Sequence, residues 1–287
     1  MARETDDQQG KITSGVQDFY QNLQTHDRNL RMAGGGDIIN HHFGIGSLSA
    51  ELPFSQWTQD QITSELYRLE LAQIDYLITA MGDVSPGEII LDAGSGRGGT
   101  AFTLTDRLMA KVHGITIAPY QAHFAHELAL RSGRENRAYF TVMNMLHLGY
   151  PREYFDRVIT NETTMYFADD SFGDVFRQFF QVLKPGGTYT LATWCFNEKN
   201  QDAHVSVDPI DQHYRSNMQS LSAYKRALQD AGFAVGKILD LTQEAIPYWE
   251  LRSVWQEASG VESHYLDGYR EGRMFYIMLS AHKPVQI

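Results

Sequence analysis

The sequence predicts an α/β protein built on a doubly wound, mostly parallel sheet of seven strands, with an N-terminal cap and an inserted lid. Two observations predict this fold. Short apolar segments alternate with amphipathic helical segments along most of the chain, and the first apolar segment runs into a glycine-rich turn that opens a helix. The segments expected to form strands are residues 89–91, 112–117, 139–143, 155–160, 188–193, 235–241 and 274–280.

The segments outside the sheet divide the chain into parts. Residues 1–15 are acidic and polar and are expected to form a disordered leader, and residues 16–60 an N-terminal cap over a substrate site. Residues 61–287 form the main domain, which begins with a helix over 61–81 because apolar residues recur there at helical spacing. The polar stretch 194–220 is expected to be an irregular lid.

The composition restricts the partners of the protein. The chain has 287 residues and a formal net charge of −11, which disfavours binding to nucleic acids and to anionic membranes, so we expect neither partner. The single cysteine, Cys195, excludes an intrachain disulfide. The chain shows no secretory signal and no apolar run of membrane-spanning length. These features predict a soluble protein that acts in the cytoplasm.

A glycine-rich turn follows the first predicted strand. The stretch Ile89-Ile-Leu-Asp-Ala-Gly-Ser-Gly-Arg-Gly-Gly99 contains the spacing G-x-G-x-x-G, which lets the backbone approach a ligand closely. A nicotinamide cofactor usually requires an acidic residue at the end of the second strand, and residues 112–118 contain none. Asp92, just before the glycines, instead suits a positively charged cofactor such as S-adenosylmethionine, which carries an ammonium and a sulfonium.

The glycine turn, Gly114-Ile-Thr-Ile-Ala-Pro-Tyr-Gln121 and Leu183-Lys-Pro-Gly-Gly187 together resemble class I methyltransferases, which have a Rossmann-like sheet. The middle stretch is similar to a signature of the cyclopropane synthase and sterol methyltransferase branch, although Ala118 and Pro119 depart from it. In that branch a Thr and a Gln make the ribose contacts usually made by an acid. The resemblance implies an S-adenosylmethionine site formed by Asp92, Gly94, Ser95, Gly96, Thr116, Gln121, Asn144 and Met145.

Four further stretches resemble geranyl diphosphate C-methyltransferases and relatives that methylate other prenyl diphosphates. They are Asn29-Leu-Arg31, His41-His-Phe-Gly-Ile-Gly46, Asn161-Glu-Thr-Thr-Met-Tyr166 and Ile246-Pro-Tyr-Trp-Glu-Leu-Arg252. The resemblance extends from about Tyr20 to Ala281 and implies methylation of an alkene carbon, with Mg²⁺ as a second cofactor. It also makes 61–287 the cofactor-binding domain. Asn40 stands where a third His or an aromatic residue is expected, and the lid matches poorly, which leaves the prenyl chain open.

This chemistry requires a base, an aromatic wall for a carbocation and a diphosphate site. The resemblance assigns the base to Glu162, which follows the fourth strand at the edge where α/β folds bind ligands. Arg31 with Asn29 is expected to hold the diphosphate, and Mg²⁺ to be held mainly by substrate oxygens and water. The expected catalytic residues are Glu162, Asn161 and Tyr166, and the expected substrate contacts are Tyr20, Asn29, Arg31, His41, Tyr248, Trp249 and Tyr269.

Several alternatives stay open. Geranyl diphosphate is the first choice of substrate, and isopentenyl and farnesyl diphosphates are alternatives because the lid sets the length of the pocket. A sterol, a lipid chain or a small-molecule heteroatom would not need the diphosphate contacts. A nicotinamide oxidoreductase or a cofactor-binding module without turnover would use the same glycine turn. A homo-oligomer is compatible with the sequence, and helix capping explains Asp169 and Asp170 better than metal binding.

Overall fold

The computed structural model describes residues 15, 17, 28–33, 37–50 and 53–285. The predicted leader lies almost entirely outside the described residues, as do a large part of the predicted cap and Tyr20. The division into leader, cap and main domain therefore remains a prediction.

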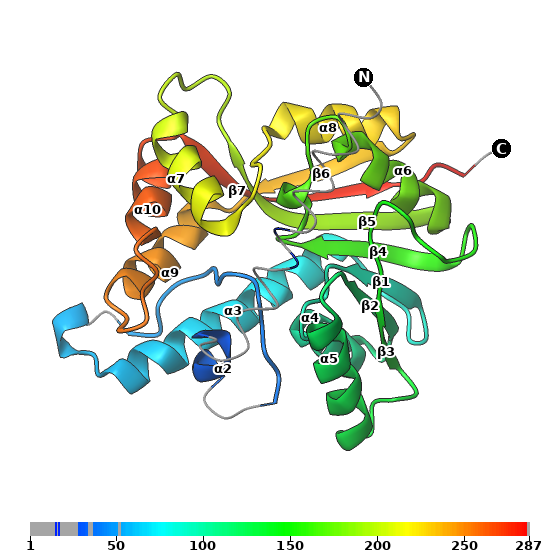
Figure 1. Cartoon of the computed structure of the whole chain (residues 1–287), viewed down its shortest axis with the longest axis horizontal. Helices are drawn as coiled ribbons and strands as arrows, with labels where there is room; N and C mark the ends of the chain where they lie inside the picture. Colours follow the sequence, from blue (N-terminus) through cyan, green and yellow to red (C-terminus); the bar gives the residue numbers. More distant parts are fainter. Residues whose placement is uncertain (1–14, 16, 18–27, 34–36, 51–52, 286–287) are drawn as a thin grey trace.

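The sheet has seven strands in the order β3-β2-β1-β4-β5-β7-β6. β7 runs antiparallel to both of its neighbours, and the other pairings are parallel. This confirms the predicted doubly wound, mostly parallel sheet (Figure 1). The strands are β1 (Ile89–Ala93), β2 (Lys111–Thr116), β3 (Ala138–Val142), β4 (Phe155–Asn161), β5 (Leu183–Phe196), β6 (Ala234–Asp240) and β7 (Met274–His282).

Helices cover both faces of the sheet. The core on one face includes side chains of α3, α4, α9 and α10, and the core on the other face includes side chains of α6 and α8. In Figure 1, α7, α9 and α10 gather beyond one end of β5 and β7, with α3 running beneath them. The helices are α2 (Arg28–Met32), η1 (Phe54–Gln56), α3 (Gln59–Met81), α4 (Gly99–Leu108), α5 (Pro119–Arg131), η2 (Thr164–Tyr166), α6 (Phe172–Val182), α7 (His204–Tyr214), α8 (Leu221–Asp230), α9 (Thr242–Ser253) and α10 (Glu262–Arg270).

The predicted lid is only partly irregular. β5 continues to Phe196, and α7 lies within the stretch 194–220 that we expected to lack regular structure. The prediction failed because α7 is short and its sequence is polar, with Pro209 inside the helix. The capping role expected for Asp169 is also wrong, since Ser171 precedes α6 and Asp169 instead accepts hydrogen bonds from Asn217 and Gln219.

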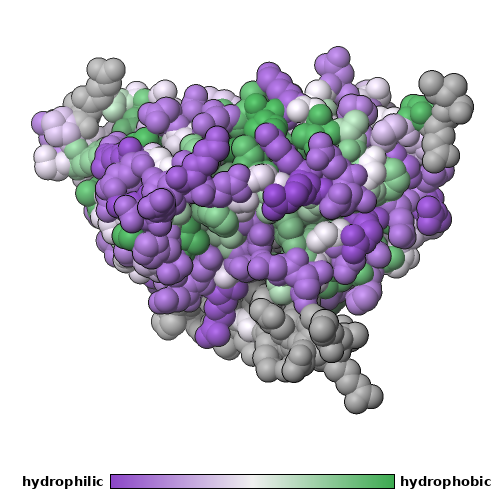
Figure 2. Space-filling view, turned by 90° about the horizontal axis from the view of Figure 1, so that it is seen from above, coloured by the Kyte–Doolittle hydropathy of each residue, from purple (hydrophilic) through white to green (hydrophobic). Residues whose placement is uncertain are grey.

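The outer surface is largely polar on the face that Figure 2 shows. Polar side chains interrupt the apolar patches on this face. Within the described part of the chain, no helix is both long and apolar enough to cross a membrane.

Helix α3 begins at a capping box, which explains why it starts two residues before the predicted helix. The Thr58 hydroxyl accepts a hydrogen bond from the backbone N–H of Gln61, and the Gln61 side chain accepts one from the backbone N–H of Thr58. These bonds partner N–H groups that a helix start leaves without an intrahelical acceptor.

We expect Thr58→Ala to lower the free energy of unfolding by about 1 kcal/mol, because the N-cap acceptor is lost at the start of a 23-residue helix. Thr58→Ser keeps the hydroxyl and serves as the control. Urea denaturation of the three proteins measures the difference, and equal stability of all three would show that the cap contributes nothing.

Candidate active site

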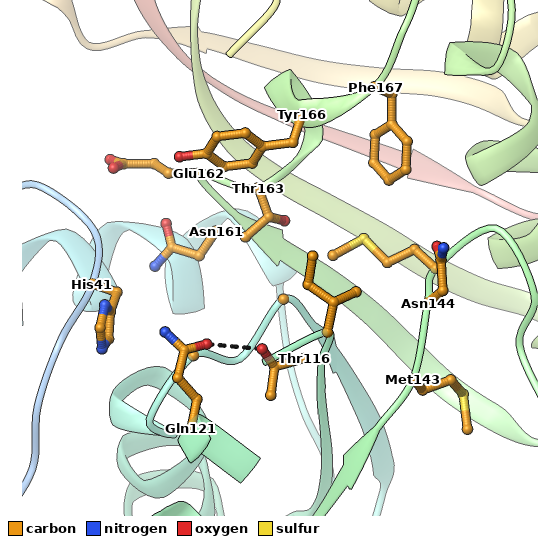
Figure 3. Close-up of a pocket in the computed structure, with 14 residues that line it drawn as sticks. His41, Thr116, Gln121, Met143, Asn144, Asn161, Glu162, Thr163, Tyr166 and Phe167 are labelled. Carbon is orange, nitrogen blue, oxygen red and sulfur yellow. Dashed lines mark hydrogen bonds between the residues drawn. The ribbon is translucent and has the colours of Figure 1, made fainter. Parts of the chain in front are cut away.

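A pocket that is partly open to solvent lies where β1, β2 and β4 end (Figure 3). In the close-up, residues that follow β4 lie above Thr116 and Gln121, and Met143 and Asn144 form a third side. The lining residues are His41, Gly94, Gly96, Thr116, Ile117, Gln121, Met143, Asn144, Met145, Asn161, Glu162, Thr163, Tyr166 and Phe167.

The glycine turn forms one wall because a side chain has no room there. A Cβ atom on Gly94 would lie 2.3 Å from Thr163 Cγ2 and 2.8 Å from Met145 Cε. The backbone φ of Gly94 is +93°, a region that disfavours other residues. The N–H groups of Gly94 and Ser95 both donate to the carbonyl of Ile115, so β2 fixes the turn.

Thr116 and Gln121 lie side by side on the pocket wall. The Thr116 hydroxyl donates to Gln121 Oε1 over 2.8 Å, and it accepts from the N–H of Ala118. The hydroxyl proton is therefore committed to the Gln121 oxygen, which leaves the Gln121 amide N–H groups as the donors of this pair. The two residues can thus present hydrogen-bond donors to a ligand without an acidic side chain.

Glu162 is the ionisable group at the centre of the site. It is 6% exposed and has a backbone φ of +55°, which is uncommon for a residue with a side chain and is often found at functional positions. Its two carboxylate oxygens accept hydrogen bonds from the Tyr276 hydroxyl (2.7 Å) and from the N–H of Phe43 (3.0 Å). Burial raises the pKa of Glu162 to about 8, against the effect of these two bonds. A carboxyl with such a pKa can exchange a proton near neutral pH.

A buried network joins the site to α3. The side-chain amides of Asn161 and Gln73 pair with each other, and the Gln73 amide also donates to the Tyr276 hydroxyl. Sequence analysis missed Gln73 and Tyr276. The one available signal was Gln73, a polar residue in the apolar helical spacing of 61–81.

An aromatic cluster adjoins Glu162, and Phe43 lies at its centre. The Phe43 ring centroid lies 4.5 Å from that of Trp249, and Trp249 stacks on Tyr265 at 3.7 Å. Trp194, Tyr214 and Tyr248 also lie within about 6 Å of the Phe43 ring. The predicted residues Tyr248, Trp249 and Tyr269 are buried in this region and do not line the pocket itself.

A buried cation and two carboxylates border the aromatic cluster. The Arg252 guanidinium lies over the Phe43 and Trp249 rings, donates to the Tyr248 hydroxyl and lies 3.4 Å from Glu262. Tyr248 in turn donates to Glu70, a fully buried carboxyl on α3 whose pKa burial raises to about 8. Arg252, Tyr248 and Glu70 thus form one hydrogen-bonded chain.

Four further predicted site residues also lie away from the pocket. Asp92 and Ser95 are buried behind its wall, and Ser95 supports the turn through Ile115. Asn29 donates to the carbonyl of Asn40, and Arg31 pairs with Glu257 and is half exposed. The other predicted cofactor residues and all three predicted catalytic residues line the pocket, as does His41.

The strand order, the antiparallel seventh strand and a glycine turn feeding a pocket at the carboxyl ends of the strands define a class I methyltransferase. In agreement, residues 90–187 match the family model of a methyltransferase domain.

The relatives make the assignment more specific. Geranyl diphosphate 2-C-methyltransferase of Streptomyces lasalocidi is 32% identical over 265 residues, which cover 91% of this chain and 87% of the relative. The enzyme of the same name from Streptomyces coelicolor A3(2) is 31% identical over 91% of this chain and 90% of its own. The chain belongs to the geranyl diphosphate C-methyltransferase family. This confirms the resemblance and decides against a nicotinamide oxidoreductase.

Solved structures agree with this assignment. A geranyl diphosphate methyltransferase in complex with geranyl diphosphate (GPP) and sinefungin superposes with a TM-score of 0.89 at 30% identity, over 95% of this chain and 99% of its own. A second structure is that of the Streptomyces coelicolor A3(2) enzyme in complex with Mg²⁺, geranyl-S-thiolodiphosphate and S-adenosyl-L-homocysteine. It superposes with a TM-score of 0.88 at 29% identity, over 95% of this chain and 98% of its own.

We expect Glu70→Gln to stabilise the protein increasingly as the pH rises from about 5 to 8. The pKa of Glu70 is raised from 4.5 to about 8, so the folded state keeps a proton that the unfolded chain releases in this window. Each such group lowers the stability by up to about 1.4 kcal/mol per pH unit as the pH rises. Denaturation of both proteins over this pH range measures the difference.

Glu65, on the same helix, provides a contrast of opposite sign. Burial alone would raise the pKa of Glu65, but hydrogen bonds from Arg68 and Ser49 lower this pKa below its usual value. Its charge therefore stabilises the fold above its unfolded pKa and less so as the pH falls, so Glu65→Gln should be destabilising at pH 7. A parallel pH trend for both variants would contradict this account.

Proposed function

We propose that the protein transfers the methyl group of S-adenosylmethionine to carbon 2 of geranyl diphosphate and that Glu162 then removes a proton. The observation that carries the proposal is the position of Glu162. Its buried carboxyl has a pKa of about 8 and lines the same pocket as the glycine turn and the Thr116–Gln121 pair. The relatives named above supply the substrate and the carbon.

The pocket fits the methyl donor. The bare backbone at Gly94 and Gly96 lets an amino acid moiety approach the turn, and Gln121 offers amide donors to ribose hydroxyls. Met143, Met145 and Phe167 supply apolar surface for an adenine ring. When bound, S-adenosylmethionine supplies an electrophilic sulfonium methyl group. The protein holds donor and alkene in line, which matters because an alkene is a weak nucleophile.

The bond changes balance without a further reactant. A C–S bond breaks as carbon 2 of the substrate alkene binds the methyl group, which leaves a cation on the neighbouring tertiary carbon. The Glu162 carboxylate then takes the proton on carbon 2, and the electron pair of that C–H bond restores the double bond. Each Glu162 oxygen accepts one hydrogen bond from the protein, so lone pairs remain for the incoming proton.

The aromatic cluster around Phe43 is suited to the cation. Ring faces attract positive charge, and Phe43 lies between the base and the rings of Trp249 and Tyr265. Arg252 would repel a cation, but the carboxylate of Glu262 lies 3.4 Å from it and offsets its charge. The cluster therefore supplies ring faces without an uncompensated positive charge.

The diphosphate is proposed to bring Mg²⁺ with it. Among the residues that the structure describes, no group of three or more His, Cys, Asp or Glu side chains could hold a metal ion. We propose diphosphate oxygens and water as its main ligands, because Mg²⁺ prefers oxygen ligands and retains bound waters. Asn29 and Arg31 remain the proposed diphosphate contacts, which requires Arg31 to exchange Glu257 for the substrate.

Other acceptors are tested alongside geranyl diphosphate. Farnesyl diphosphate differs from it in chain length, and isopentenyl diphosphate in chain length and in the position of its double bond. A sterol, lipid or small-molecule acceptor would not need Mg²⁺. Loss of activity in a chelator separates these groups. We also keep a cytoplasmic location and a homo-oligomer as proposals, which cell fractionation and size-exclusion chromatography with light scattering would test.

We expect methyl-labelled S-adenosylmethionine with Mg²⁺ to label geranyl diphosphate, and Glu162→Gln to reduce this transfer by about 100-fold or more, since the variant lacks the base. In the wild type kcat/KM should rise with pH up to about 8, because only the ionised carboxylate accepts a proton. Isopentenyl and farnesyl diphosphates run in parallel. No label in any prenyl diphosphate, with cofactor binding intact, would overturn the proposed substrate class.

We expect Gly94→Ala to weaken binding of S-adenosylhomocysteine by at least about tenfold, because the new methyl group would meet Thr163 and Met145 in the pocket. Gly133→Ala is the matched control: its φ is also positive (+70°), but nothing lies within 4 Å of the added atom. Isothermal titration calorimetry compares the three proteins. Equal affinity of Gly94→Ala and wild type would exclude the glycine turn from the cofactor site.

A further inference from the structure

The hydroxyl of Tyr276 has a fixed direction in its hydrogen-bond network. Gln73 Nε2 lies 2.9 Å from this oxygen and is a donor only, so the hydroxyl accepts there. Its single proton is then available for Glu162 Oε1, 2.7 Å away. The acceptor is a carboxyl, and a hydroxyl that donates to it favours the charged form over the neutral one.

The Gln73 amide also forms a second, reciprocal pair with Asn161. Gln73 Nε2 donates to Asn161 Oδ1 (2.6 Å), and Asn161 Nδ2 donates back to Gln73 Oε1 (3.1 Å) and to Thr100 Oγ1 (3.2 Å). Thr100 lies in the first turn of α4, just after the glycine turn. The network therefore runs from the beginning of α4 through Asn161, Gln73 and Tyr276 to the base.

This network is costly to bury, which calls for a function. Gln73 is fully buried in the middle of α3, where an apolar residue would complete the helix face, and Tyr276 is 1% exposed on β7. A buried amide without hydrogen-bond partners would lower the stability, yet both the nitrogen and the oxygen of the Gln73 side chain have partners here.

We propose that Tyr276 and Gln73 are positioning residues of the methyl transfer reaction, which hold the Glu162 side chain in place and favour its ionised, proton-accepting form. The proposal rests on the proposed function for the role of Glu162. Tyr276 acts directly through its hydroxyl, and Gln73 acts through Tyr276. Neither residue needs to contact the substrate.

Other groups around Glu162 also influence its ionisation and are kept the same in all proteins compared, so the Glu70→Gln substitution used below is made in each of them. Glu70 opposes the charge of Glu162 from α3, and Arg252 favours it from α9. The phenols of Tyr265 and Tyr269 face it from α10. His41 and Tyr166 line the same pocket.

The test measures the titration of Glu162 without substrate. Infrared difference spectra over a pH series report the protonated carboxyl groups. The band that is lost in Glu162→Gln is assigned to Glu162. The Glu70→Gln substitution removes the overlapping band of the second buried carboxyl. We expect Tyr276→Phe to raise the titration midpoint by about one pH unit, because a donor to the charged form is removed. Gln73→Met should raise the titration midpoint by less, because this substitution removes only the hydrogen bond from Gln73 to the Tyr276 hydroxyl and keeps the hydroxyl itself.

The methyl transfer rate gives a second readout. In Tyr276→Phe, kcat/KM should fall by about tenfold on the acid side of the profile and approach the wild-type value at high pH, as one pKa unit requires. A merely structural role would lower the rate equally at every pH. Tyr189→Phe is the matched control, since Tyr189 is a fully buried strand tyrosine whose hydroxyl lies 2.7 Å from Thr160 and away from Glu162.

An unchanged or lowered midpoint in Tyr276→Phe would overturn the proposal, as would a shift of the same size in Tyr189→Phe. If Tyr276→Phe does not fold, Gln73→Met decides alone, and an unchanged midpoint there overturns the proposal. Failure of the proposed function has a different signature, in which wild-type protein transfers no label to any prenyl diphosphate while its carboxyl titration can still be measured.

Discussion

The burial of one carboxyl, Glu162, is the constraint on which the site depends. A glutamate in water has a pKa near 4.5. The pKa of Glu162 is about 8 because its side chain is removed from solvent just after β4. Burial alone would make the group a poor base, since it would stay protonated. The two hydrogen bonds from Tyr276 and Phe43 work in the opposite direction and keep the ionised form within reach. The base is thus balanced between two effects that the fold sets independently.

The same constraint explains why distant parts of the chain converge on one point. Tyr276 lies on β7 and donates its hydroxyl proton to Glu162. Because β7 runs antiparallel beside β5, Tyr276 is also the register partner of Trp194, a member of the aromatic cluster. Phe43 reaches Glu162 from the segment that precedes α3. The backbone N–H of Phe43 donates to Glu162 and its ring packs in the aromatic cluster, so the proposed proton transfer and cation stabilisation both depend on the placement of this residue.

The sequence predicts interactions between residues that are close along the chain better than interactions between distant residues. Gly94, Thr116, Gln121 and Glu162 lie in short motifs at the ends of strands, where local pattern and position along the sheet coincide, and all of them line the pocket. Tyr276 contacts Glu162 across 114 residues, and no local pattern marks it.

Two other differences have a similar physical cause. Arg31 resembles a diphosphate ligand in sequence, but the fold places Glu257 within its reach, and ion pairs between distant segments leave no local trace. The helix α7 buries only two apolar side chains, Val207 and Ile210, and this short repeat around an internal Pro209 is too weak to mark a helix in the sequence.

The His-His-Phe-Gly-Ile-Gly stretch shows how tightly the site is built. A Cβ atom on Gly44 would lie 2.5 Å from the Tyr248 ring and 2.6 Å from Leu69 Cβ, so this glycine permits close approach between α3 and α9. On its far side, Ile45 N–H donates to the Leu69 carbonyl and Gly46 N–H to that of Glu244, which fixes the segment to both helices. Only with the backbone this close can the Phe43 N–H lie 3.0 Å from the Glu162 carboxylate. The absence of a side chain at Gly44 is therefore a condition for the hydrogen bond that Phe43 donates to Glu162.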